Sequence, residues 1–133
     1  AERRPQPGAA ELEGLVTGFR AAGVTLDYRT SGEPTDDQSL GLVVYRIVQE
    51  SLTNALRYAP GAAVTASVHW SGYGVGIEIV DDGPGGGQPS QGAGRGLLGL
   101  RERAALYAGT VEAGPRPEGG WAVHVTLRTG GAP

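Results

Sequence analysis

Cysteine and lysine are both absent from this chain of 133 residues, and its 11 cationic side chains are all arginine. Without cysteine there is no disulfide, no thiolate metal ligand and no thiol nucleophile, which suits a reducing compartment, so we expect a cytoplasmic domain. P-loop nucleotide-binding proteins and eukaryotic-type protein kinases both place a lysine on the phosphates of their nucleotide. The absence of lysine therefore excludes both classes.

Long apolar segments and basic stretches are also missing. No apolar run approaches the ~20 residues that a membrane span needs, and the start of the chain lacks a signal-peptide pattern. We therefore expect no direct membrane contact from this chain, and any anchor would lie outside it. The formal net charge is −3. Since no basic stretch could neutralise a run of phosphates, nucleic-acid binding is disfavoured, whereas a single nucleotide is compatible with this charge.

Glycine is plentiful by contrast. It accounts for 24 of the 133 residues, against an average usage of about 7%. Much of the excess lies between residues 83 and 99. This concentration favours a loop whose backbone approaches a ligand closely, and we expect residues 84–93 to form a flexible lid.

The hydrophobic pattern predicts one domain over residues 9–129, with a linker over 1–8 and a tail over 130–133. Helical spacing predicts helices beginning near Leu12 and Leu97 and a main helix from about Asp36 to Ala59, with Thr35 and Gln38 as its capping box. Alternation of apolar and polar residues predicts strands at 24–28, 64–68, 75–79, 110–113 and 121–127. Because helices and strands do not alternate strictly, we expect an α+β two-layer sandwich, with helices on one face of a mostly antiparallel sheet.

Three segments have patterns typical of a nucleotide site. On the main helix, Glu50, Asn54 and Arg57 share one face because they lie four and seven positions apart. Asp81 ends a strand where a glycine turn begins, and residues 94–99 place glycines at a helix start, where unpaired backbone N–H groups favour anions. The opposite face of the main helix carries the expected core stripe, Val44, Val48, Leu52, Ala55 and Ala59.

The runs Val44–Ala59, Val80–Gly85 and Gly94–Arg103 resemble the N box and the two glycine boxes of bacterial sensor histidine kinases, in the family's order. The similarity covers residues 24–128 and is greatest to the subfamily that pairs with nitrate-response-type regulators. It implies the Bergerat-type ATP-binding sandwich also seen in type II topoisomerases and heat-shock chaperones. The implied cofactors are ATP and Mg²⁺, with the nucleotide between helices and lid.

The resemblance also implies roles for residues of the main helix. It makes Asn54 the protein ligand of Mg²⁺, because magnesium prefers hard oxygen ligands and keeps several waters. It makes Glu50 the catalytic carboxylate, which polarises the acceptor or a water near the γ-phosphate. Arg57 takes the position of a phosphate-contacting cation, and Tyr58 follows it in the ATP site.

The glycine boxes carry the remaining expectations. Asp81 is expected to accept a hydrogen bond from the amino group of adenine, which guanine cannot supply, while Asp82 faces solvent. Four glycines are expected to let the backbone approach the nucleotide closely or to cover its phosphates: Gly83, Gly85, Gly94 and Gly96. Leu97 and Leu98 are expected to anchor the lid to the core. The role of three arginines is left open, because each could contact phosphate or lie on a solvated helix face: Arg95, Arg101 and Arg103.

Neither histidine fits a phosphoacceptor. His69 and His124 fall on the polar phase of predicted strands, whereas the family's acceptor lies in a helical hairpin that this chain lacks. We therefore expect an ATP-binding half-kinase, which passes the γ-phosphoryl group to the dimerisation and histidine-phosphotransfer domain of the same kinase, with a response regulator downstream. Two alternatives are an anti-sigma-factor serine kinase of the same fold and a degenerate nucleotide-binding docking module.

Overall fold

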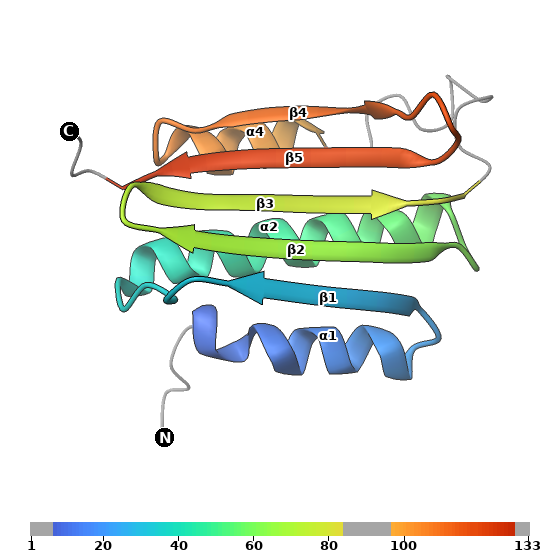
Figure 1. Cartoon of the computed structure of the whole chain (residues 1–133), viewed down its shortest axis with the longest axis horizontal. Helices are drawn as coiled ribbons and strands as arrows, with labels where there is room; N and C mark the ends of the chain where they lie inside the picture. Colours follow the sequence, from blue (N-terminus) through green and yellow to red (C-terminus); the bar gives the residue numbers. More distant parts are fainter. Residues whose placement is uncertain (1–6, 84–96, 130–133) are drawn as a thin grey trace.

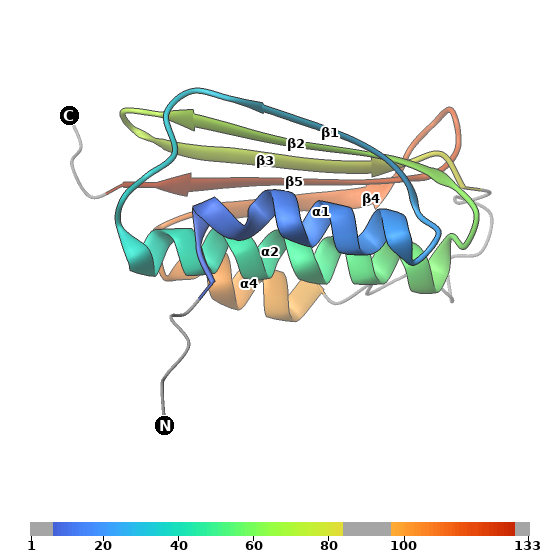
Figure 2. The same cartoon turned by 90° about the horizontal axis from the view of Figure 1, so that it is seen from below.

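The fold is one sheet with helices packed on a single face, as Figures 1 and 2 show. The computed structural model describes residues 7–83 and 97–129. Its elements are η1 (Ala9–Glu11, a 3₁₀ turn), α1 (Leu12–Ala21), β1 (Thr25–Ser31), α2 (Gln38–Tyr58), β2 (Ala63–Ser71), β3 (Gly74–Asp81), α4 (Leu97–Ala105), β4 (Thr110–Pro115) and β5 (Trp121–Arg128). Apart from η1, their order is the predicted one. The expected lid at 84–93 lies outside the described residues.

The five strands of the described residues form one sheet, in the order β1-β2-β3-β5-β4. β1 and β2 are parallel, because α2 returns the chain across the sheet between them, and the other pairs are antiparallel. Along β2, β3 and β5 every second side chain is buried against the helices. The predicted α+β sandwich is therefore confirmed.

α2 lies in the middle of the helical layer and supplies much of the core. Val44, Val48 and Leu52 are fully buried, and Ala55 and Ala59 are 3% exposed, so the predicted core stripe is confirmed. The predicted capping box is wrong. Asp37 caps the helix, because its Oδ1 accepts hydrogen bonds from the Ser39 and Leu40 backbone N–H groups at 2.9 and 3.2 Å.

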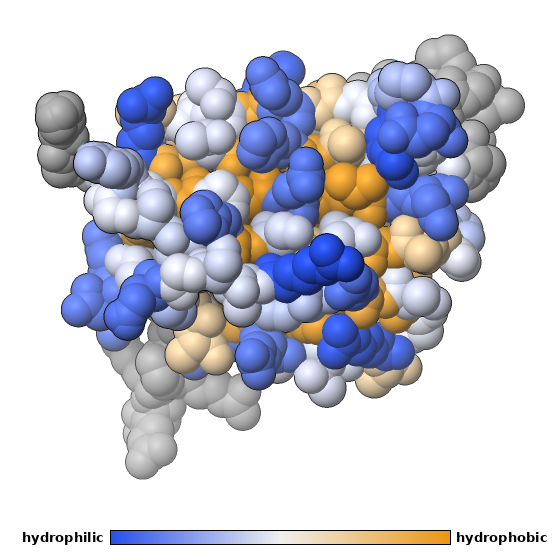
Figure 3. Space-filling view, in the orientation of Figure 1, coloured by the Kyte–Doolittle hydropathy of each residue, from blue (hydrophilic) through white to orange (hydrophobic). Residues whose placement is uncertain are grey.

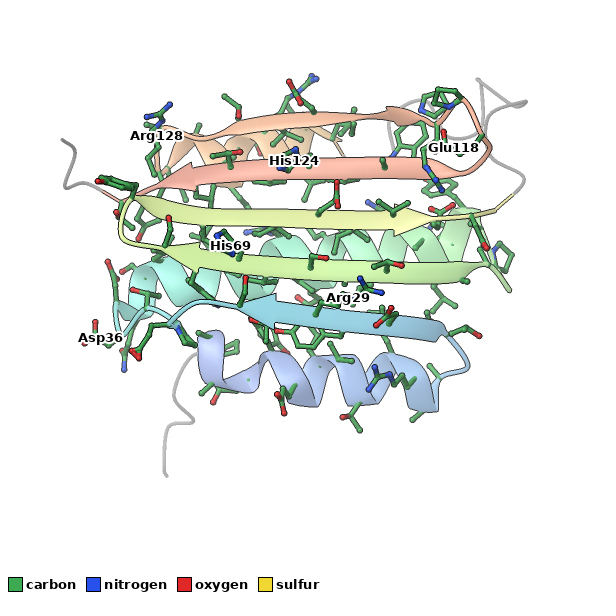
Figure 4. The ribbon with its side chains drawn as sticks, viewed as in Figure 1. Arg29, Asp36, His69, Glu118, His124 and Arg128 are labelled. Atoms are coloured by element: carbon green, nitrogen blue, oxygen red, sulfur yellow. The ribbon has the colours of Figure 1, made fainter. Side chains whose placement is uncertain are left out.

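The helix-free face of the sheet is largely polar. Figure 3, in the orientation of Figure 1, shows hydrophilic side chains across this face with hydrophobic residues visible between them. His69 on β2 and His124 on β5 are exposed there, as predicted (Figure 4). In the strand register His124 lies opposite Glu78 of β3 and Glu112 of β4. In the described parts of the chain, no helix combines the length and the apolar character that crossing a membrane requires.

Candidate functional site

α2 turns a polar stripe away from the core. Glu50 and Asn54 are half-buried on it, and Arg57 is exposed near the end of the helix. The Arg57 guanidinium lies 5.9 Å from the centroid of the Tyr58 ring, within reach of a cation–π contact. A carboxylate, an amide and a cation thus follow one another over two helical turns, as the spacing predicted.

Asp81 ends β3 as a buried carboxylate, 3% exposed. Its Oδ1 accepts a hydrogen bond from the Gly83 backbone N–H at 3.1 Å. Asp81, Asn54, Ser51 and Trp121 line one small cavity of about 10 Å³, room for about one water molecule. The structure therefore joins the end of β3 to the polar face of α2, although 27 positions separate Asp81 from Asn54 in the sequence.

Asp82 has a different environment. It is exposed, its Oδ1 accepts a hydrogen bond from the Ala63 backbone N–H at 2.8 Å, and its own N–H donates to the Ala63 carbonyl. Asp82 therefore ties the end of β3 to the start of β2. Of the two neighbouring carboxylates, Asp81 is the one that lines the cavity.

Gly83 lies against the end of α2. A Cβ atom placed on Gly83 would come within 2.8 Å of the Ala59 Cβ and 3.2 Å of Asp81 Oδ1. Both neighbours belong to the packed interior, so neither moves away freely. A side chain at this position would push apart the two elements that form the cavity.

Gly83→Ala is accordingly expected to lower the free energy of unfolding by about 1–3 kcal/mol, as overpacking does. Gly76→Ala, on the preceding strand β3, is the matched control, since a Cβ there meets nothing within 4 Å. Urea unfolding of both variants measures the difference. Equal destabilisation by the two substitutions would contradict the packing argument.

α4 meets the polar stripe of α2 at Glu50. Arg103 Nε donates to Glu50 Oε1 at 2.5 Å, with the two side chains 40% and 29% exposed. Gly99 lies next to the same carboxylate: a Cβ there would be 3.0 Å from Glu50 Oε2. The sequence analysis left two roles open for Arg103, contact with phosphate or exposure on a solvated helix face, and did not predict its pairing with Glu50. Arg101, the second open arginine on α4, is exposed.

The first turn of α4 tests the predicted anchors. Leu97 is half-buried and packs against the core, but Leu98 is 72% exposed, so its expected anchoring role is wrong. Leu97, Leu100 and Ala104 lie three, four and seven positions apart on the inner face, and Leu98 is turned about 100° from Leu97. Three predicted site residues, Gly85, Gly94 and Gly96, lie outside the described residues, as does Arg95, whose role the sequence left open.

The β4–β5 turn contributes residues that the sequence analysis missed. Arg116 Nη1 donates to the Asp81 carbonyl oxygen at 3.3 Å, and its Nη2 donates to Glu118 Oε2 at 2.9 Å. The pKa of the exposed Glu118 is lowered, first by its own backbone N–H and then by Arg116. Gly120, with φ +89°, packs so close to the Asp81 carbonyl that a Cβ has no room. Nothing in local sequence points from this turn to Asp81.

Ser51 was also missed. It is 4% exposed, it lines the cavity beside Asp81, and its Oγ has no hydrogen-bond partner among the described residues. Ser51 lies three positions before Asn54 on α2, so helical spacing was a usable signal. A buried hydroxyl at the cavity wall favours a polar molecule beside it, since leaving such a group unsatisfied costs free energy.

Residues 40–131 match the family described as histidine kinase-, DNA gyrase B- and HSP90-like ATPase. The chain belongs to this family. It is 35% identical over 117 residues to the oxygen sensor histidine kinase NreB of Staphylococcus carnosus, an alignment that covers 80% of this chain and 34% of NreB. The chain thus spans about a third of the length of this curated relative.

Solved structures agree on the fold. The ATP-binding domain of PrrB from Mycobacterium tuberculosis matches with a TM-score of 0.67 at 24% identity, covering 92% of this chain and 94% of that one. The histidine kinase domain of the E. coli osmosensor EnvZ matches with a TM-score of 0.70 at 17% identity, covering 100% and 94%. With the family match, these findings confirm the resemblance to ATP-binding domains of sensor histidine kinases.

Proposed function

We propose that this chain binds Mg-ATP and transfers the γ-phosphoryl group to a histidine on the dimerisation domain of a sensor histidine kinase. The observation that carries the proposal is the buried Asp81 carboxylate, which shares one cavity with Asn54 below the polar stripe of α2. The proposed domain spans residues 9–129 and acts in the cytoplasm, with a response regulator as the downstream partner.

Asp81 and Ser51 suit the base of the nucleotide. An ionised carboxylate only accepts hydrogen bonds, so Asp81 selects a donor such as the amino group of adenine. Guanine has a carbonyl oxygen at that position, which a carboxylate repels. The Ser51 hydroxyl, directly or through a water, supplies a second polar contact at the same wall of the cavity.

Asn54, Arg57 and Tyr58 are proposed to hold the phosphate end. The Asn54 amide oxygen is a hard ligand suited to Mg²⁺, which takes its other ligands from water and from phosphate. When bound, Mg²⁺ neutralises charge on the phosphates. The exposed Arg57, one turn further along α2, is free to turn toward phosphate oxygens while Tyr58 supports its guanidinium.

Glu50 is proposed to act on the acceptor. Phosphoryl transfer asks the protein mainly to position the reacting groups and to stabilise charge. Glu50 lies one turn before Asn54 on the same stripe, so its carboxylate is next to the proposed metal ligand on the side away from Arg57. There it would accept a hydrogen bond from the attacking imidazole and orient the ring toward the γ-phosphate.

The test of this function has two steps. ATP and GTP binding, each with and without Mg²⁺, should show tighter binding of ATP and a gain from Mg²⁺. With radiolabelled ATP, the chain alone should incorporate no stable phosphoramidate, and adding the dimerisation domain in trans should produce acid-labile label on that domain. Label on the isolated chain that disappears in His69→Gln or His124→Gln would contradict the proposal. Label on serine of an added protein would favour the serine-kinase alternative.

Asn54→Ala is expected to remove the gain in ATP affinity that Mg²⁺ gives, because the amide oxygen is the proposed protein ligand. The free energy of unfolding should change by no more than about 1 kcal/mol, as expected for a residue outside the core. Calorimetric titration with and without Mg²⁺ measures the first quantity. Thr53→Ala, at the exposed preceding position, is the control. An unchanged magnesium dependence in Asn54→Ala would remove this residue from the site.

A further inference from the structure

The Glu50 carboxylate lies against α4, which holds it through one oxygen and approaches the other closely. Oε1 accepts the hydrogen bond from Arg103 Nε, and Oε2 lies beside Gly99. Gly99 and Arg103 are four positions apart and therefore lie on one face of α4, one turn from each other. One face of α4 thus combines a glycine, which lets the Glu50 carboxylate approach the helix closely, with an arginine, which donates a hydrogen bond to that carboxylate.

Stability does not explain this arrangement. The two side chains are 40% and 29% exposed, and ion pairs that reach solvent add little to the free energy of folding. A glutamate side chain has three rotatable bonds, so an unheld Glu50 would sample several positions over the polar stripe. The hydrogen bond from Arg103 holds the Glu50 side chain in one of these positions.

We infer that Arg103 is a positioning residue for Glu50. It fixes the direction of the carboxylate, so that the base meets the acceptor imidazole within hydrogen-bond reach. This inference rests on the proposed function, in which Glu50 acts on the acceptor. Arg103 then contributes to the rate of transfer, because a displacement of about 1 Å at a catalytic group can cost 10²-fold. It contributes little to ATP affinity, which distinguishes it from an arginine that binds phosphate.

The test compares four proteins: the unchanged chain, Glu50→Gln, Arg103→Gln and the double variant. For each, ATP affinity and the rate of transfer to the dimerisation domain at saturating ATP are measured, and thermal unfolding shows that the variant is folded. Arg103→Gln should slow transfer by roughly 10-fold, with ATP affinity within about 2-fold of the unchanged chain. In the Glu50→Gln background the same substitution should slow transfer no further, because the group it positions is gone.

Two further variants sharpen the test. Arg103→Lys should recover part of the rate, since an ammonium can still hold the carboxylate but lacks the planar guanidinium. Arg128→Gln, at an exposed position on β5 outside the candidate site, should change neither quantity.

Three results would overturn the inference. Weaker ATP binding in Arg103→Gln, in both backgrounds, would make Arg103 a phosphate ligand. Rate losses that multiply in the double variant would mean that Arg103 acts independently of Glu50. If Glu50→Gln alone left the rate unchanged, the proposed role of Glu50 would fail first and Arg103 would have nothing to position.

Discussion

Glu50→Gln is expected to lower the rate of phosphoryl transfer at saturating ATP by roughly 10²–10⁴-fold, the usual contribution of a general acid or base. Glutamine keeps the size of the side chain and can still accept a hydrogen bond, but it has lost the negative charge. ATP affinity should stay nearly unchanged, because a base acts in the transition state more than in the ground state. Single-turnover transfer to the dimerisation domain and equilibrium ATP titration measure the two quantities.

Glu102→Gln is the matched control for this prediction. Glu102 is an exposed glutamate on α4, so the same chemical change occurs outside the polar stripe of α2. Its transfer rate should equal that of the unchanged chain. If Glu50→Gln lost binding and rate to the same degree, Glu50 would be a structural residue of the ATP site and not its base.

Asp81→Asn is expected to weaken ATP binding by roughly 10- to 100-fold and to reduce the discrimination against GTP. A hydrogen bond to a charged acceptor stabilises by about 1.5–3 kcal/mol, and the neutral amide accepts more weakly while presenting donors of its own. The asparagine oxygen can still accept from the Gly83 backbone N–H, so the local fold should persist. Titrations of ATP and GTP in parallel measure the affinity and the preference.

The neighbouring residue provides the control. Asp82→Asn removes the same charge at an exposed position whose side chain ties β3 to β2. Its ATP affinity should lie within about 2-fold of the unchanged chain, because no base contact is proposed there. A loss in Asp82→Asn with none in Asp81→Asn would move the base-reading position by one residue.

Periodicity accounts for what was predicted correctly. Buried side chains recur about every 3.6 residues along α2 and every 2 residues along β2, β3 and β5. Each period can be recognised within a short segment of sequence. The polar stripe follows from the same helical geometry, which is why Glu50, Asn54 and Arg57 were found together. The failures were at element ends: Asp37 replaced Thr35 as the cap, and Leu98 turned outward.

The sequence by itself determined the order of the elements, the polar face of α2 that carries the candidate site and the exclusion of lysine-dependent nucleotide folds. Only the tertiary structure decided what surrounds that face. It brought Arg103 to Glu50 across 53 positions and placed the Arg116 guanidinium on the Asp81 carbonyl across 35. It also buried Ser51 and Trp121 at one cavity with Asp81. Such pairs depend on how α4 and the β4–β5 turn pack against α2 and β3, and packing between distant segments leaves no period in the chain.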